Sequence, residues 1–219
     1  MSNMDFTYAV ARIRALEVSL FSEATIDQLI ACPTEQNCLQ FLTEKGWGDS
    51  DTPLEADAVL NRETQKTWET IREMHIDMSI FDVLSYPNEF HNLKAAIKET
   101  CRKGKHPGIY YEDCALSGEE LEKIIAEKEF SKLPEYMAAA AKEAYETLMH
   151  TRDGQLCDII IDKATLEAIY AAGKKAKAGI LKSYAEDTVA VANIKIAVRS
   201  QKTAKSVEFM KRAMAKCDS

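Results

Sequence analysis

The stretch FHNLKAAIK, residues 90–98, returns 101 residues later as VANIKIAVR, residues 191–199. Both strings place an Asn, a Leu or Ile, a Lys, an Ala, an Ile or Val and a cation in the same order, so Asn92 corresponds to Asn193. A second pair, SEATIDQLIA at residues 22–31 and SGEELEKIIA at residues 117–126, occurs in the same order. The sequence therefore predicts an internal duplication of about a hundred residues.

Apolar residues recur at helical spacing along the chain, and stretches with strand character are short and isolated. We therefore predict an all-α fold, a helical bundle built from quasi-repeats. Gly104, Pro107 and Gly108 form the strongest punctuation in the chain. They divide it into a first helical repeat unit at residues 1–106 and a second at residues 107–219.

Local signals predict where several helices begin. Thr25 with Gln28, and Ser117 with Glu120, have the spacing of capping boxes, and Thr52 in TPLE is a predicted N-cap. Other signals predict interruptions. Pro87 is predicted to separate a short helix from the one that carries Asn92, although it could also sit in that helix's first turn. The last predicted helices run from about Asp158 to Tyr184, from about Asp187 to Ser200, and after Thr203.

Composition limits the function classes. The chain has 219 residues, of which 46% are hydrophobic and 29% charged, and its formal net charge is −7. This acidic balance argues against a nucleic-acid partner, which would call for a basic face. The longest apolar run is much shorter than the roughly 20 residues of a membrane-spanning helix, so we expect no span. Because the first residues lack a secretory pattern, we expect a cytoplasmic location.

The sequence predicts no catalytic residue, no cofactor and no metal. The four histidines lack the spacing of a helical metal site, and the six cysteines include no C-x-x-C pair. Gly46 and Gly48 are followed by acidic residues rather than a helix start, and the segment from Gly173 to Gly179 lacks a P-loop ending. A helical-bundle enzyme that uses core Glu and His side chains stays a minor alternative.

Three stretches carry a family resemblance: YAVARIRALEVSLFS at residues 8–22, LIACPTEQNCLQFLTEKGWG at residues 29–48, and the repeated N-[LI]-K-x-A-[IV]-[KR] element. Together they resemble the C subunit of V-type (A-type) ATP synthases and ATPases, the counterpart of the d subunit of eukaryotic V-ATPases. The resemblance implies helical quasi-repeats arranged as a funnel. It also implies a non-catalytic central-stalk rotor component that links the rotor shaft of the ATPase head to the ring of membrane subunits, in proton or sodium transport.

The same resemblance sets further expectations. Asn92 and Asn193 are expected to be structural repeat positions, each bonding the backbone of a neighbouring segment, or else to face a partner subunit. Members of the family have about three units where two are recognised here, so we expect a fragment or a short member. The helix after Thr203 would then either pack atypically or support self-association. The alternative function is an unrelated duplicated helical adaptor or scaffold protein.

Overall fold

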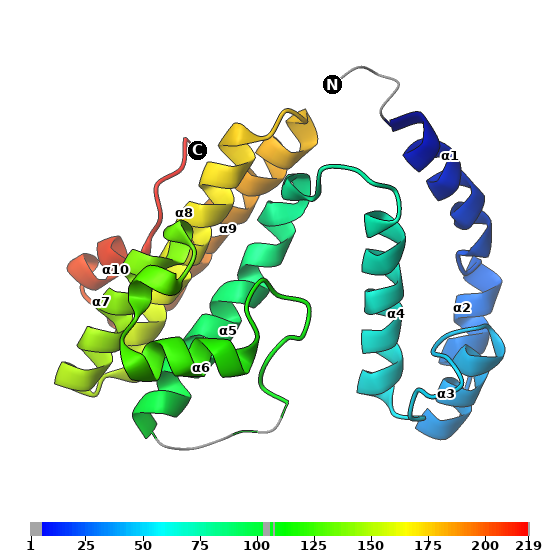
Figure 1. The fold of residues 1–219 in the computed structure, drawn as a ribbon, viewed down its shortest axis with the longest axis horizontal. Coiled ribbons are helices and arrows are strands. Elements are labelled where there is room, and N and C mark those ends of the chain that lie inside the picture. The colour runs from blue at the N-terminus through cyan, green and yellow to red at the C-terminus, as the bar shows by residue number, and fades with distance from the viewer. Residues whose placement is uncertain (1–5, 103–105, 107, 219) are drawn as a thin grey trace. The chain divides into compact units, whose positions relative to one another are not determined.

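The computed structural model describes residues 6–102, 106 and 108–218. Over these residues the regular secondary structure is helical and contains no strand, which confirms the predicted all-α fold (Figure 1). The chain divides into two compact units, Met1–Met78 and Ser79–Ser219.

The first unit consists of short helices followed by one longer helix. Its elements are α1 (Thr7–Leu16), the 3₁₀ turn η2 (Glu17–Ser19), α2 (Glu23–Ile30), α3 (Glu35–Glu44) and α4 (Ala56–Arg72). Helices α2 and α3 pack against each other. Few apolar side chains are fully buried in this unit; they include Leu39 and Leu42 of α3 and Val59 of α4.

Two predicted helix starts in the first unit are wrong. The N-cap of α2 is Ser22, whose hydroxyl accepts the Thr25 N–H, so Thr25 lies inside the helix. The N-cap of α4 is Glu55 rather than Thr52. The Thr52 hydroxyl instead donates to Asp49 Oδ1 at 2.6 Å and accepts the Asp49 N–H at 3.1 Å. A hydroxyl that is bonded within the preceding turn cannot cap the helix, so α4 begins later.

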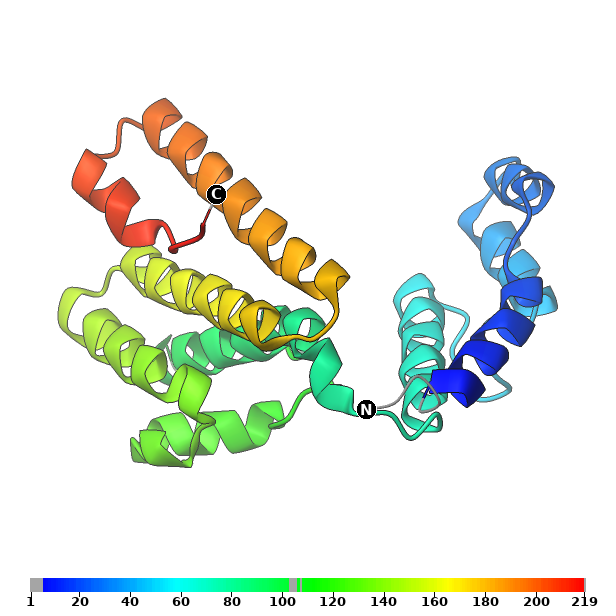
Figure 2. The ribbon, with the colours of Figure 1, turned by 90° about the horizontal axis from the view of Figure 1, so that it is seen from above.

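The second unit holds the longest helices. Its elements are the 3₁₀ turn η3 (Met78–Phe81), which begins at the division between the units, then α5 (Asp82–Arg102), α6 (Gly118–Glu127), η4 (Phe130–Lys132), α7 (Glu135–Thr151), α8 (Gly154–Lys175), α9 (Gly179–Lys202) and α10 (Val207–Ala213). Helix α8 packs against α5, α7 and α9 (Figure 2). One large apolar cluster joins α5, α6, α7 and α8, and it forms the core of the unit.

Local caps explain several helix starts of this unit. Ser117 and Glu120 form the predicted capping box of α6, in which each side chain bonds the other residue's backbone N–H. Asp153 caps α8 by accepting the N–H groups of Gln155 at 2.8 Å and Leu156 at 3.1 Å. These contacts satisfy donors that have no partner inside the first turn of a helix.

Two predictions of where helices break in the second unit are wrong. Pro87 does not separate two helices, because it lies inside α5, past the first turn. The predicted helix from Asp158 to Tyr184 is two helices, and residues 176–178 join α8 to α9. Gly173 lies near this join, where a Cβ would be 2.2 Å from the Cβ of Ala185. The glycine thus lets the backbones of α8 and α9 approach closely.

The division between compact units does not coincide with the predicted division between repeat units at residues 106 and 107. Helix α5, on the first side of that boundary, packs with α6, α7 and α8 on the other side. Gly104 and Pro107 lie outside the described residues, whereas Gly108 has a positive φ of 72°. The two repeat units stay a prediction about the sequence. The division between the compact units lies before α5 because α5 buries its apolar face against the helices that follow it.

Candidate site: two asparagine clamps

Asn92, on α5, has a fully buried side chain that holds a distant backbone segment. Its Nδ2 donates to the Tyr111 carbonyl at 2.8 Å, and its Oδ1 accepts the Tyr111 N–H at 2.9 Å. Tyr111 lies in the connection that leads into α6. The amide uses its donor and its acceptor on one residue, which satisfies the requirement that buried polar groups be bonded.

Asn193, on α9, makes the same pair of bonds to another segment. Its Nδ2 donates to the Ala215 carbonyl at 2.8 Å, and its Oδ1 accepts the Ala215 N–H at 3.1 Å. Its side chain is also buried, and Ala215 follows α10. We call each arrangement an asparagine clamp, the first made by Asn92 on Tyr111 and the second by Asn193 on Ala215. In both, a helix holds a segment without regular secondary structure that lies 19 or 22 residues further along the chain.

A polar cluster supports the first clamp. Glu99, one of the buried charged residues of α5, accepts the His106 backbone N–H at 2.6 Å. The Tyr110 hydroxyl lies 3.1 Å from Glu99 and 3.0 Å from Glu122 of α6, so it joins the two helices. Hydrogen bonding, first from the His106 backbone, lowers the pKa of Glu99, whereas burial raises the pKa of Tyr110. The connection between α5 and α6 is therefore held at several adjacent points.

A second buried carboxylate of α5 bonds a tyrosine of α7. The Tyr136 hydroxyl donates to Glu89, and the Tyr136 ring lies 4.6 Å from the ring of Tyr86 on α5. Burial, followed by the bond to Glu89, raises the pKa of Tyr136. In the sequence, Glu89 is notable only because the second copy has an alanine, Ala190, at the corresponding position. The partner of Glu89 could not be predicted because Tyr136 lies 47 residues away.

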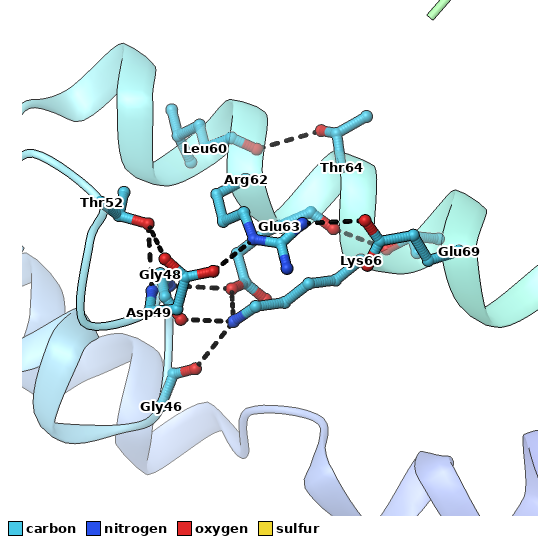
Figure 3. A network of polar contacts seen from close by, with 11 residues as sticks. Gly46, Gly48, Asp49, Thr52, Leu60, Arg62, Glu63, Thr64, Lys66 and Glu69 are labelled. Carbon is cyan, nitrogen blue, oxygen red and sulfur yellow. Dashed lines mark hydrogen bonds and ion pairs between the residues drawn. The ribbon is translucent and has the colours of Figure 1, made fainter.

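In the first unit, a polar network closes the glycine-containing loop before α4 (Figure 3). Lys66 donates to the carbonyls of Gly46 and Gly48, while Glu63 accepts the Gly48 N–H at 2.8 Å. Gly46 and Gly48 have positive φ values of 87° and 72°, which favour glycine. Because the Gly48 N–H and both carbonyls already bond to α4, the loop is built around its own helix rather than around a phosphate.

A neighbouring arginine ties the same loop to α4. Arg62 Nε donates to Asp49 at 2.6 Å, and another guanidinium nitrogen donates to Glu69 at 3.0 Å (Figure 3). The bond to Thr52, followed by the one to Arg62, lowers the pKa of Asp49. These bonds stabilise the loop against α4.

Among the described residues, no group of three or more His, Cys, Asp and Glu side chains has the geometry to hold a metal ion. The buried carboxylates Glu89 and Glu99 both bond tyrosine hydroxyls. Every helix in the described part of the chain is too short or too polar to cross a lipid bilayer. What these polar groups can do is hold helices and connections in fixed positions.

Fold and site together define a class: an all-helical protein whose buried amides and carboxylates fix backbone segments to long helices. Residues 9–218 match the family model described as the ATP synthase (C/AC39) subunit. The chain belongs to this family, and it is therefore a subunit of the V-type or A-type ATPase class. No curated protein and no solved structure matches the chain.

Proposed function

We propose that the chain is a non-catalytic central-stalk subunit of a V-type ATP synthase or ATPase. It links the rotor shaft of the soluble head to the membrane subunit ring and transmits torque for ion transport. Family membership over residues 9–218 supports this role. The subunit would lie on the cytoplasmic side, held at the membrane through the complex rather than by a span of its own.

The observation that carries the mechanical part of the proposal is the pair of asparagine clamps. A torque-transmitting subunit must resist shear between its helices, and close-packed interiors have low compressibility. Helix α8, with 22 residues, is about 33 Å long and packs against α5, α7 and α9. The clamps add directional bonds that fix where the connections after α5 and α9 lie. Such bonds favour a rigid unit over a set of sliding helices.

A tagged form of the chain, purified from its native membranes in mild detergent, tests the proposed placement. We expect rotor-shaft and membrane-ring subunits to co-purify in fixed proportion. Recovery of other proteins without any ATPase subunit would favour the alternative, a duplicated helical adaptor or scaffold. Cross-linking of the recovered complex would then show which partner lies beside each unit.

The torque role needs a separate measurement. In a complex that contains Asn92→Leu, we expect ATP hydrolysis to continue while ion pumping per ATP falls, because the connection between α5 and α6 loses its fixed position. Asn88→Leu is the matched control, since Asn88 is only partly buried on the same helix. Equal loss of hydrolysis and pumping in the Asn92 variant, with assembly intact, would contradict a coupling role.

The non-catalytic part is tested on the isolated chain. We expect its melting temperature to be the same with and without Mg-ATP. A ligand at a hundred times its Kd would add about 2.7 kcal/mol of stability, which is a readily measured shift. An upward shift that depends on nucleotide concentration would show a nucleotide site and overturn this part of the proposal.

A further inference from the structure

The apolar positions of the repeated motif are buried in α5 and exposed in α9. In α5, the relative exposures of Phe90, Leu93 and Ile97 are 1%, 0% and 0%. Their counterparts in the sequence repeat, Val191, Ile194 and Val198 of α9, are 47%, 63% and 46% exposed. We call these three α9 residues the α9 apolar face. Over the part of the chain that the structure describes, the same pattern is thus covered in α5 and open to solvent in α9.

Helix α6 supplies part of the partner surface for α5. Phe90, Leu93 and Ile97 lie in one core cluster with Leu121 and Ile125 of α6. The two α6 residues are almost completely buried, and α5 packs directly on α6. Inside this chain, an apolar face of this kind therefore packs on a helix that begins after a serine N-cap.

Helix α2 is the counterpart of α6 in the sequence repeat, and its matching positions are uncovered. Ser22 and Ser117 cap the two helices with the same bond to the third helical residue. Ile26 and Ile30 of α2 correspond to the buried Leu121 and Ile125 of α6. They are 41% and 76% exposed.

Cations lie beside the α9 apolar face. In α5, Lys94 and Lys98 form ion pairs with Asp162 and Asp158 of α8. Their counterparts in α9, Lys195 and Arg199, are exposed. Neither cation forms an ion pair within residues 6–102, 106 and 108–218.

Helix α2 offers the complementary charge. Glu23 and Asp27 lie one turn apart, beside Ile26 and Ile30, and both carboxylates are exposed. Opposite charges around an apolar centre favour one orientation of two helices and disfavour others. Cations therefore lie beside the α9 apolar face, and carboxylates lie beside the exposed apolar residues of α2.

We propose that α9 of one copy of this chain packs on α2 of a second copy. Val191, Ile194 and Val198 would cover Ile26 and Ile30, as α5 covers α6 within one chain. The contact joins two different surfaces, so it is heterologous, and each added copy presents one further face of each kind. The proposal concerns the isolated chain and does not depend on its role in an ATPase.

A pair of variants tests this head-to-tail contact. Light scattering at increasing concentration should show growing oligomers of the unaltered chain. Ile194→Asp disables α9, and Ile30→Asp disables α2, so each variant alone should stay monomeric. An equimolar mixture should form a 1:1 dimer, because one intact α9 meets one intact α2 and both remaining faces are disabled. Val207→Asp, which alters an exposed residue in the first turn of α10, should leave the association unchanged.

Several outcomes would overturn the proposal. They are an unaltered chain that is monomeric at every concentration, a variant mixture that stays monomeric, or association that persists in Ile194→Asp alone. Circular dichroism identifies a variant that fails to fold. If one does, charge variants replace the aspartate variants. One copy then carries Lys195→Glu and Arg199→Glu, and the other carries Glu23→Lys and Asp27→Lys. These change only exposed residues, and again only the mixture should associate.

Discussion

Helices α5 and α9 carry the same motif and the same asparagine clamp, yet they are supported differently. In α5 the clamp lies between two buried carboxylates, Glu89 and Glu99, which bond side chains or backbone from other elements. In α9 the corresponding positions are Ala190 and Ser200, which carry no charge. The comparison teaches that a single amide is sufficient to hold a backbone segment, while neighbouring positions decide how strongly that region is connected to its surroundings.

The largest expected effect comes from removing the first clamp. Asn92→Leu leaves the N–H and the carbonyl of Tyr111 without partners, and we expect the free energy of unfolding to fall by about 2–4 kcal/mol. Chemical denaturation followed by circular dichroism measures the loss. Asn88→Leu makes the same chemical change on the same helix and should alter stability by less than about 0.5 kcal/mol. Equal effects of the two substitutions would show that the clamp adds nothing.

Removal of the second clamp should cost less. Asn193→Leu frees the backbone groups of Ala215, but Val191 and Ile194 beside it are exposed, so water can reach this side of α9. We therefore expect a loss of about 1–2 kcal/mol. The same denaturation experiment compares it with Asn92→Leu. A larger loss than that of the first clamp would reverse the comparison between α5 and α9.

The next largest effect should depend on pH and should distinguish α5 from α9. The pKa of Glu99 is lowered from its ordinary 4.5 in the folded chain, so its carboxylate stabilises the fold above that value and loses this contribution as the pH falls below it. Glu99→Gln should cost about 1–2 kcal/mol at pH 7, and the difference from the unaltered chain should shrink below pH 4.5. Ser200→Ala on α9 is the control. A pH-independent difference for Glu99→Gln would argue against an ionised Glu99.

The smallest expected effect concerns the bond between α5 and α7. Tyr136→Phe removes the hydroxyl that donates to Glu89, and the ring contact with Tyr86 remains. A loss of about 0.5–1.5 kcal/mol should follow. Tyr184→Phe on α9 alters a 42% exposed ring and should change the stability by less than about 0.5 kcal/mol. If both variants lose the same amount, the Glu89 bond is not a source of the extra support in α5.

Short-range patterns were predictable, with instructive exceptions. The capping box of Ser117 and Glu120 was found from sequence because both partners lie within one turn. Thr52 has the same kind of sequence signal but bonds Asp49 instead, so a competing local bond moved the start of α4 to Ala56. Pro87 was expected to interrupt a helix that continues through it. In these cases a neighbouring bond or tertiary packing outweighed the local preference.

The site was predictable only in part. Repetition of the motif pointed to Asn92 and Asn193, and their position on mostly apolar helices suggested bonds to backbone. The identities of the clamped residues, Tyr111 and Ala215, depend on how each connection folds back over its helix. Glu99 gave no signal at all, because its main partner is a backbone N–H that approaches it only in the folded chain.

By itself, the sequence determined the helical character of the chain, the order of the repeated motifs and the pair of asparagines, because helix periodicity and caps depend on residues close together in the chain. Only the tertiary structure decided that α5 packs with α6, α7 and α8, so that compact units divide after Met78. It alone decided that Leu93 is buried while Ile194 is exposed. The physical reason is that burial requires a second surface, and that surface comes from segments distant in sequence.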